Sequence, residues 1–498
     1  MRLPRVREIS VNGFLFKLAA PVIFLRGQLQ GQLQGQLRGL VVVLVWQKSG
    51  IGCQVQFSMT QFSTTRFFIT TFQGLNSIMV SIRKFLFTSL LLLSASSQSV
   101  LAQQMNTASP ESVGVASAGL QEATTRLQRH IDNGDIAGVV AAVARDGKLI
   151  YFEALGQMDL EQGKVMPEDA LFRIYSMSRQ LTSAAVLQLY DQGKFQFDDP
   201  VSKYLPQFAD QRVLIDSNST DVMQTKTRTA DMTIAHLLTH TSGLGSRSSR
   251  LYVENNVRDR NITLDELVDN AARVPLFHEP GSAFLYGLHA TILGKLVEIW
   301  SGQPFDEYLK QHLFEPLGMD STMFWATGAD AERLAVVYRP TNGKLAPYEI
   351  ETVPFNVQPN LIEGGVGMLS TVMDYMQFAQ MVLNKGELNG TRLLSEATAT
   401  LMYENAVPAQ AMPIGTDGYW LGSGWTLGGF NLVMDPSTYD FPVSQGTIWW
   451  DGSAGTRFFI DPEQNMITVI MAQVSPSNGG GFREEFTETV DAAITDRR

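Results

Sequence analysis

Ser176 and Arg179 stand one helical turn apart at the start of a helical pattern. The apolar residues that follow them recur at helical spacing, and they are Leu181, Ala184, Ala185 and Leu189. A serine in this position can cap the helix, because its hydroxyl accepts a hydrogen bond from a backbone N–H two or three residues on. It can also be a nucleophile if a nearby group takes its proton. Both interpretations fit these residues alone.

Two further groups of residues could carry chemistry. His236 and His240 lie four residues apart, which is a spacing that could bind zinc on one face of a helix. No acidic residue completes a zinc motif beside them, so we interpret both as structural histidines. Tyr286 precedes a second helical pattern and could be a core tyrosine with a satisfied hydroxyl. It could also be a general base if positive charge lies nearby, since a phenol titrates at about pH 10.

The elements that must position these residues begin and end with strand patterns. Val139–Val143 and Leu149–Phe152 are joined across an Asp-Gly turn, which is a strong hairpin signal. Strand patterns return at Thr456–Ile460 and Met466–Met471. Because the two ends carry the strands, we expect them to share one sheet.

Helical patterns fill the rest of the chain. One helix is predicted from Leu120 to Ile131, with Asn133-Gly134 as its stop. The pattern after Tyr286 includes Ile292, Leu296 and Ile299 and ends near Ser301-Gly302, and the chain stays mostly helical to about residue 325. The sequence therefore predicts an α/β (α+β) fold, with an antiparallel sheet formed from both chain ends, flanked by helices, and a mostly helical inserted subdomain.

The order of these blocks resembles the serine beta-lactamase-like family, which includes class C beta-lactamases, penicillin-binding proteins and related carboxylesterases. Ser176-Met177-Ser178-Arg179 resembles the Ser-x-x-Lys block of that family. Four later segments match in the expected order, and they are Phe197–Val201 with Tyr204–Pro206, Ile234–Leu244, Pro280–Tyr286 and Trp449–Thr456. The resemblance covers about residues 105 to 490.

The resemblance implies a role for each of six residues. Ser176 would be the nucleophile, Tyr286 the group that relays its proton, and Arg179 a stabiliser of negative charge. The backbone N–H groups of Ser176 and Ser453 would form the oxyanion hole, which needs no particular side chain. Trp450 and Gly452 would lie on the strand beside the substrate.

Three positions depart from the family pattern. Arg179 replaces the lysine, and an arginine stays protonated in proteins, so it cannot accept the proton of the serine. Trp450 replaces a lysine or histidine that could hold a substrate carboxylate, and Asp451 would repel a carboxylate if it faced the site. Tyr286-Gly287-Leu288 lacks the asparagine that often follows the tyrosine. We therefore expect neutral or apolar acyl substrates rather than penicillins or peptidoglycan.

These observations predict an acyl-serine hydrolase that cleaves an ester or amide and resembles the carboxylesterases. One alternative is a catalytically impaired protein that binds a ligand. A second is a beta-lactamase or DD-peptidase, which Arg457 would support if it reached the carboxylate position. The expected partner is a small acyl substrate, and the chemistry implies neither a cofactor nor a metal. The identity of the acyl group and the oligomeric state stay open.

Charge divides the chain near residue 102. Residues 1–102 hold ten Lys/Arg and one acidic residue, Glu8, whereas residues 103–498 hold 28 Lys/Arg and 48 Asp/Glu, a net charge of −20. Such an acidic protein is not expected to bind nucleic acid. The single cysteine, Cys53, lies in the first part, so the second part can form no disulfide.

Residues 79–102 have the layout of a signal peptide. Ser81-Ile82-Arg83-Lys84 precedes an apolar run, and a small-residue end closes the segment at Ala102. A signal must lie at the true N-terminus, so we interpret residues 1–78 as a non-native upstream extension. Their apolar run Leu40–Trp46 is shorter than the roughly 20 residues of a spanning helix. We expect a hydrolase domain at 103–498, without a membrane span, in the periplasm or outside the cell.

Overall fold

The computed structural model describes residues 105–477 and 479–498, together with five strands near the start of the chain. The chain divides into two compact units, Met1–Ser99 and Val100–Arg498. The five early strands form an antiparallel sheet in sequence order: β1 (Arg7–Val11), β2 (Phe14–Ala19), β3 (Val22–Gly27), β4 (Leu40–Ser49) and β5 (Gly52–Gln61). The predicted signal peptide at 79–102 lies outside the described residues. The interpretation of residues 1–78 as an upstream extension therefore stays a prediction.

A nine-stranded sheet organises the second unit and is built from both of its ends, as predicted. Its order is β18-β19-β20-β21-β22-β7-β8-β6, with β9 paired to β8. Its strands are β6 (Asn106–Thr107), β7 (Gly138–Arg145), β8 (Lys148–Asp159), β9 (Lys164–Val165), β18 (Ser423–Trp425), β19 (Asn431–Val433), β20 (Ile448–Gly452), β21 (Thr456–Asp461) and β22 (Met466–Ala472). The pairing of β22 with β7 joins the two ends, and all pairs are antiparallel except β6 with β8.

The predicted Asp-Gly hairpin joins β7 to β8. Asp146 and Gly147 both have positive φ values, 53° and 69°, which are the values that a two-residue type I′ turn requires. Every residue of β7 is buried, because helices cover both faces of the sheet. The strand is therefore a central one, although its partners are antiparallel.

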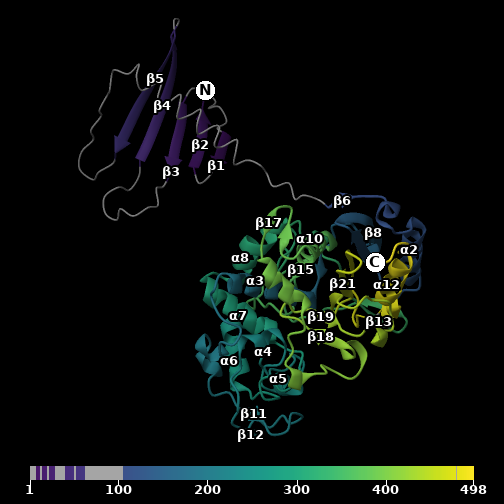
Figure 1. The fold of residues 1–498 in the computed structure, drawn as a ribbon. Helices are drawn as coiled ribbons and strands as arrows, with labels where there is room; N and C mark the ends of the chain where they lie inside the picture. Colours follow the sequence, from purple (N-terminus) through teal and green to yellow (C-terminus); the bar gives the residue numbers. More distant parts are fainter. Residues whose placement is uncertain are drawn as a thin grey trace. The chain divides into compact units, whose positions relative to one another are not determined.

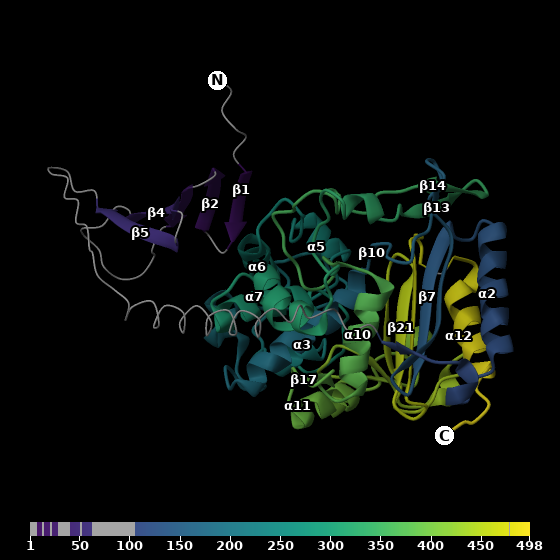
Figure 2. The same cartoon turned by 90° about the horizontal axis from the view of Figure 1, so that it is seen from above.

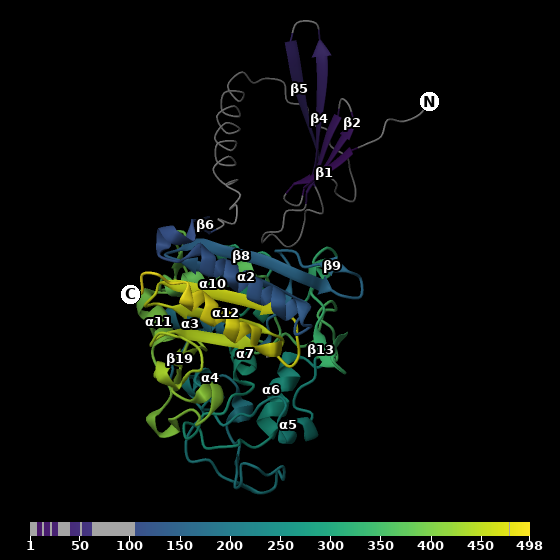
Figure 3. The same ribbon diagram turned by 90° about the vertical axis from the view of Figure 1, so that its right-hand side faces the viewer.

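Successive residues of β7 belong to two separate cores. Val139, Ala141 and Val143 pack with α2 (Ser117–Asp132) and α12 (Phe482–Ala492) on one face. Val140, Ala142 and Ala144 face the opposite way, toward α3 (Ser178–Asp191) and α10 (Val372–Leu383). Figure 2 shows α2 and α12 on one side of β7, and α3 and α10 on the other. Figure 3 shows α2 and α12 side by side across the first face. This alternation is the period-two pattern of a strand with an apolar layer on each side.

The inserted segment is mostly helical, as predicted (Figure 1). Its helices are α4 (Ile234–Leu238), α5 (Arg250–Glu254), α6 (Leu264–Arg273), α7 (His289–Ser301), α8 (Phe305–Leu309) and α9 (Glu315–Leu317), and α11 (Glu396–Thr400) follows α10. Four two-stranded sheets complete the unit: β10 (Phe172–Arg173) with β15 (Leu369–Ser370), β11 (Val213–Leu214) with β12 (Thr225–Lys226), β13 (Tyr338–Thr341) with β14 (Lys344–Pro347), and β16 (Glu387–Leu388) with β17 (Thr391–Arg392). Ile299, which the helical pattern of α7 includes, is 40% exposed. Among the described residues, no helix has the length and apolarity to cross a membrane.

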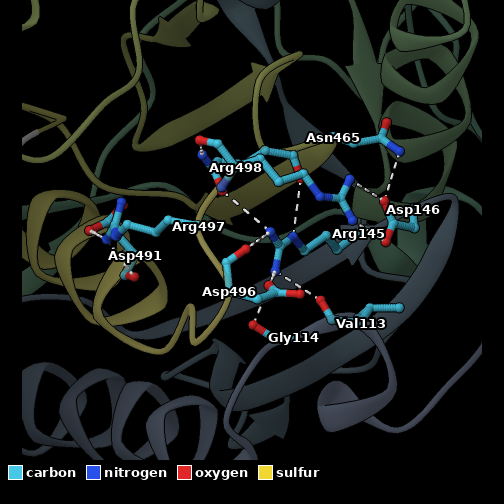
Figure 4. Close-up of polar contacts among 10 residues, drawn as sticks. Val113, Gly114, Arg145, Asp146, Asn465, Asp491, Asp496, Arg497 and Arg498 are labelled. Atoms are coloured by element: carbon cyan, nitrogen blue, oxygen red, sulfur yellow. Dashed lines mark hydrogen bonds and ion pairs between the residues drawn. The ribbon is translucent and has the colours of Figure 1, made fainter.

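One buried arginine ties the start of this unit to its end (Figure 4). Arg145 is fully buried at the end of β7 and donates hydrogen bonds to the carbonyls of Val113 and Gly114, at 2.8 and 3.0 Å. Its guanidinium also forms an ion pair with Asp496. Because a buried charge is costly unless it is paired and hydrogen-bonded, these contacts fix the C-terminal tail against the segment before α2.

Candidate active site

Ser176 lies in a short 3-10 turn, η2 (Tyr175–Met177), that runs directly into α3. Tyr175 has a φ of 42°, a left-handed value that costs a non-glycine residue about 1–3 kcal/mol. The turn is held by the hydroxyl of Tyr375, which donates to the carbonyl of Met177 at 3.1 Å. A fixed, strained turn therefore presents a half-buried serine.

The capping interpretation of Ser176 is wrong. The N-cap of α3 is Met177, and it makes no side-chain capping bond. Within residues 105–477 and 479–498, the hydroxyl of Ser176 makes no hydrogen bond. The chain continues from η2 into α3 with helical backbone angles, so no extended N-cap position exists at Ser176.

Arg179 lies one turn after Ser176 and is almost fully buried, with 6% of its surface exposed. Its Nη1 donates a hydrogen bond to the carbonyl of Gly287 at 2.8 Å. The guanidinium carbon lies 4.2 Å from the centre of the Tyr286 ring, in a cation–π contact. No carboxylate of the described residues forms an ion pair with it. The positive charge of Arg179 is therefore directed at Tyr286 rather than neutralised.

Trp450 contacts the same tyrosine from the sheet. Its indole Nε1 donates a hydrogen bond to the hydroxyl oxygen of Tyr286 at 2.8 Å. Trp450 is 3% exposed on β20, whereas Tyr286 is half-buried in the loop before α7. The structure thus brings Arg179, Tyr286 and Trp450 into direct contact, although they come from three separate parts of the sequence.

Gly452 and Ser453 lie where β20 ends beside the serine turn. A Cβ atom on Gly452 would stand 2.5 Å from the carbonyl oxygen of Ile174, which immediately precedes η2. Only glycine allows the strand and the turn to approach so closely. Ser453 follows in the exposed turn between β20 and β21. The two proposed oxyanion donors, the N–H groups of Ser176 and Ser453, therefore belong to segments that pack side by side.

Asp451 and Arg457 face away from this cluster. They pair across β20 and β21, on the face opposite to Trp450, and their side chains lie 3.4 Å apart. Arg457 is fully buried and also pairs with Glu484 of α12 at 2.8 Å. Arg457 is therefore not at the carboxylate position, and Asp451 does not face Trp450 or Tyr286.

Two histidines form a buried pair beside Tyr286. The Nδ1 atoms of His240 and His289 lie 2.8 Å apart, and the backbone N–H of Gly287 donates to Nδ1 of His240 at 3.4 Å. Burial lowers the pKa of His289 to about 3, and the Arg179 charge contributes in the same direction. Burial likewise holds the pKa of His240 well below its usual range, assisted by His289 and Arg179. Both rings are therefore neutral at pH 7.

The interpretation of His236 and His240 as structural is consistent with these contacts. His236 completes a capping box at the start of α4, because its Nδ1 accepts a hydrogen bond from the backbone N–H of Thr233. Across the described ranges, no three His, Cys, Asp or Glu side chains gather where they could hold a metal ion. The sequence analysis did not single out His289, which is the first residue of α7 and lies three residues after Tyr286.

Aromatic rings surround Tyr286, and sequence reasoning did not single them out. The ring centres of Trp420 and Trp425 lie 5.9 and 5.8 Å from that of Tyr286. Phe284 lies 5.2 Å from Trp420 and 5.7 Å from Trp425. No spacing in the sequence relates these residues, because they meet only when β18 and β20 pack against the loop before α7. Beside Arg179 and the histidine pair, the tyrosine is therefore surrounded by aromatic rings.

Comparison with known proteins identifies the family to which this chain belongs. The family model described as Beta-lactamase matches residues 123–489, which include each of the residues described above. The chain belongs to the beta-lactamase family. It is therefore a member of a family of serine hydrolases, and the resemblance inferred from the sequence blocks is confirmed.

Relatives within the beta-lactamase family include esterases. Esterase EstB of Burkholderia gladioli is 31% identical over 366 residues, which cover 68% of this chain and 86% of the esterase. Protein Rv1367c of Mycobacterium tuberculosis is 29% identical over 353 residues, which cover 69% of this chain and 88% of that protein. Among solved structures, EstCE1, a hydrolase with promiscuous acyltransferase activity, superimposes with a TM-score of 0.64 at 28% identity, covering 75% of this chain and 98% of EstCE1.

Proposed function

We propose that this beta-lactamase-family member is a carboxylesterase-like acyl-serine hydrolase in which Tyr286, rather than a lysine, accepts the proton of Ser176. One observation carries the proposal: Tyr286 lies between the Arg179 guanidinium, 4.2 Å above its ring, and the Trp450 N–H, 2.8 Å from its oxygen. A positive charge and a hydrogen-bond donor both stabilise negative charge on a phenolate. Arg179 thus supports a proton acceptor without being one.

The reaction follows from these roles. The Tyr286 phenolate takes the proton of Ser176, and the Ser176 oxygen bonds to the carbonyl carbon of the ester. The N–H groups of Ser176 and Ser453 stabilise the resulting oxyanion. When the intermediate collapses, the alcohol leaves with the proton held by Tyr286, and an acyl-serine remains. Water then gives a proton to Tyr286 and its oxygen bonds to the acyl carbon. When the bond from that carbon to the Ser176 oxygen breaks, Tyr286 returns the proton to the serine oxygen, which releases the acid and restores both Ser176 and the phenolate.

Aromatic surroundings favour neutral acyl substrates over those that carry a carboxylate. Trp450 offers no charge for a carboxylate, and its N–H is already used by Tyr286. Arg457 cannot replace the missing cation, since it is buried on the other face of the sheet and paired with Glu484. These contacts support an esterase rather than a beta-lactamase or DD-peptidase.

Binding without turnover remains the second candidate, and a specific observation favours it. The hydroxyl of Ser176 has no hydrogen-bonded base within the described part of the chain, and Arg179 is bound to the Gly287 carbonyl. Catalytic hydrogen bonds are often long or absent without substrate, so reactivity must be measured directly.

A fluorophosphonate probe tests the proposal. We expect intact mass spectrometry to show one label on the purified protein and none on a Ser176→Ala variant, because the probe reacts only with an activated serine. Ser178→Ala is the matched control, since that serine lies one step along the helix and its hydroxyl accepts a bond from the Met368 N–H. Labelling confined to an Arg179→Lys variant would mean that the natural protein is a disabled hydrolase and would overturn the proposal.

A further inference from the structure

Trp420 is the most exposed of the three tryptophans in the aromatic cluster around Tyr286. Its ring centre lies 5.4 Å from that of Trp450 and 5.9 Å from that of Tyr286. Trp450 is 3% exposed and Trp425 fully buried, whereas Trp420 is only half-buried. Because Trp420 lies beside Tyr286 and is not fully buried, it is placed to contact a substrate, while the two buried tryptophans support it.

Trp420 lies in a loop, so other contacts must fix its position. The residue ends a 3-10 turn, η9 (Gly418–Trp420), between α11 and β18. A Cβ on Gly415 would stand 2.3 Å from the Cβ of Trp420, so the loop folds back on itself with no space for a side chain. Loops are generally mobile, and a substrate contact made by a loop residue must be fixed by further contacts.

The preceding residue supplies that contact. The Tyr419 ring packs edge-on against Trp449 at 5.3 Å, and Trp449 and Trp450 point to opposite faces of β20. Tyr419 and Trp420 therefore contact two consecutive tryptophans on the two faces of one strand. This arrangement fixes Trp420 beside Tyr286 on one face while Tyr419 reaches the other.

Two buried arginines hold the hydroxyl of Tyr419. Arg457 of β21 donates to it through Nη2 at 2.8 Å, and Arg483 of α12 approaches it at 3.4 Å. Both arginines are essentially fully buried, and the acidic groups of Asp451 and Glu484 balance their charges. A charge-assisted bond from a buried, fixed guanidinium is stronger than one between neutral groups. The loop is thus anchored to the rigid sheet.

We propose that Trp420 determines specificity by stacking on an aromatic ring of the ester substrate, and that Tyr419 and Arg457 are the residues that position it. This inference rests on the proposed esterase function. An aromatic substrate fits this cluster, because a substrate ring next to Trp420 and Phe284 makes offset or edge-on ring contacts that an aliphatic chain cannot make. The ring could belong to the alcohol or to the acyl group.

Paired esters distinguish the two sources of the ring. Acid release is measured for benzyl acetate against butyl acetate, and for ethyl phenylacetate against ethyl butyrate. We expect one aromatic ester to exceed its aliphatic partner about tenfold in kcat/KM, mainly through KM, since one or two ring contacts are worth about 1 kcal/mol each. The pair that shows the preference identifies the part of the substrate that carries the ring.

Variants of the full chain test whether the loop residues cause the preference for the aromatic ester. Trp420→Leu should reduce the aromatic-to-aliphatic ratio of kcat/KM to about twofold, because the stacking contact is lost for the aromatic ester, whereas any effect on Tyr286 changes both rates and cancels in the ratio. Trp420→Phe should keep a large part of it. Tyr419→Phe, which retains the ring but loses the bond to Arg457, should raise KM for the aromatic ester without changing kcat. Tyr204→Phe is the control, since its hydroxyl binds Asp199 elsewhere.

Failure of this inference is distinguishable from failure of the proposed function. Binding of benzyl acetate and butyl acetate to Ser176→Ala, with and without Trp420→Leu, measures recognition in a protein that cannot be acylated. An aromatic preference that needs Trp420 in this background supports the inference even if the natural protein hydrolyses no ester. Hydrolysis without an aromatic preference, or a preference that survives Trp420→Leu, would overturn the inference and leave the esterase proposal standing.

Discussion

At the scale of single residues, the arrangement around Tyr286 explains how an arginine can stand where the family has a lysine. Arg179 contributes charge through a cation–π contact and uses a hydrogen bond to Gly287 to fix its own position. The neutral histidine pair contacts the same residue, because the Gly287 N–H donates to His240. Charge is thus concentrated on one cation, with neutral groups around it.

The two contacts on Tyr286 should contribute separately to catalysis. Tyr286→Phe removes the proton acceptor and should lower kcat about 10²- to 10⁴-fold with little change in KM. Trp450→Phe removes the N–H donor but keeps an aromatic ring, and it should cost about tenfold, as expected for one hydrogen bond to a charged group. Steady-state kinetics on an ester measures both, with Tyr403→Phe as a control whose hydroxyl binds the Val382 carbonyl. Equal losses in the two variants would contradict these roles.

At the scale of elements, the site depends on the close approach of β20 to η2. The strand ends at Gly452, against the carbonyl of Ile174, and the turn that follows carries Ser453. Tyr175 keeps its left-handed backbone because its ring is buried against Phe355 at 5.8 Å. The proposed oxyanion donors are therefore backbone groups whose positions depend on packing between elements rather than on side-chain identity.

Alanine substitutions at Gly452 and Ser453 should distinguish the contribution of the backbone to catalysis from that of the side chains. Gly452→Ala introduces a methyl group 2.5 Å from the Ile174 oxygen, so it should lower kcat at least about 100-fold, the cost of losing one oxyanion donor. Ser453→Ala leaves the N–H in place and should stay within about threefold of the natural protein. Esterase rates together with thermal denaturation report the two effects. A larger loss at Ser453 would show that its side chain takes part.

At the scale of the whole molecule, the fold closes on itself through buried charge as well as apolar packing. Arg145 joins the segment before α2 to the tail after α12. Arg457 and Arg483 join the sheet to α12 and to the Tyr419 loop. Acidic partners balance the charge of each of these arginines. Loss of one partner would therefore leave a buried charge unpaired and strongly destabilise the protein.

Acid should destabilise the protein through the histidine pair. The unfolded His289 titrates at about pH 6.5, whereas burial lowers its pKa to about 3 in the fold. The unfolded chain then binds more protons below pH 6.5, so stability is complete above that pH and falls as the pH drops toward 3. One such residue should account for on the order of 3 kcal/mol at pH 4.

Denaturant unfolding from pH 7 to pH 4 measures this effect. A His289→Gln variant should lose less stability over that range than the natural protein, because its side chain does not titrate. His312→Gln is a suitable control, as His312 is exposed and its ring is hydrogen-bonded to Gln303. Parallel curves for the natural protein and His289→Gln would contradict the assignment of acid sensitivity to this pair.

Export is a further property of the whole molecule, and we propose a periplasmic or secreted location. The proposal rests on the signal layout of residues 79–102. Expression from Met79 should yield an exported product whose N-terminus is Gln103, as determined by intact mass. Retention of the uncleaved chain in the cytoplasm would contradict both the signal and the interpretation of residues 1–78.

The sequence by itself determined the fold class and the main elements. Asp146-Gly147, the β-branched runs near both ends and the Gly302 stop are local signals, and each acts through backbone geometry that neighbouring residues set. The serine, the arginine and the tyrosine were found because their short motifs have fixed spacing. Local chemistry is readable from local sequence.

Only the tertiary structure decided what surrounds those residues. Trp450 donates to Tyr286, Arg457 turns away from it, and Trp420 lies beside it, and these facts depend on which face of β20 each residue occupies. The register of a strand against its partners fixes that face, and a shift of one residue would reverse it. His289 and His240 meet for a similar reason, since 49 residues separate them in the chain. Contacts between distant segments depend on packing of the whole core, which no short motif encodes.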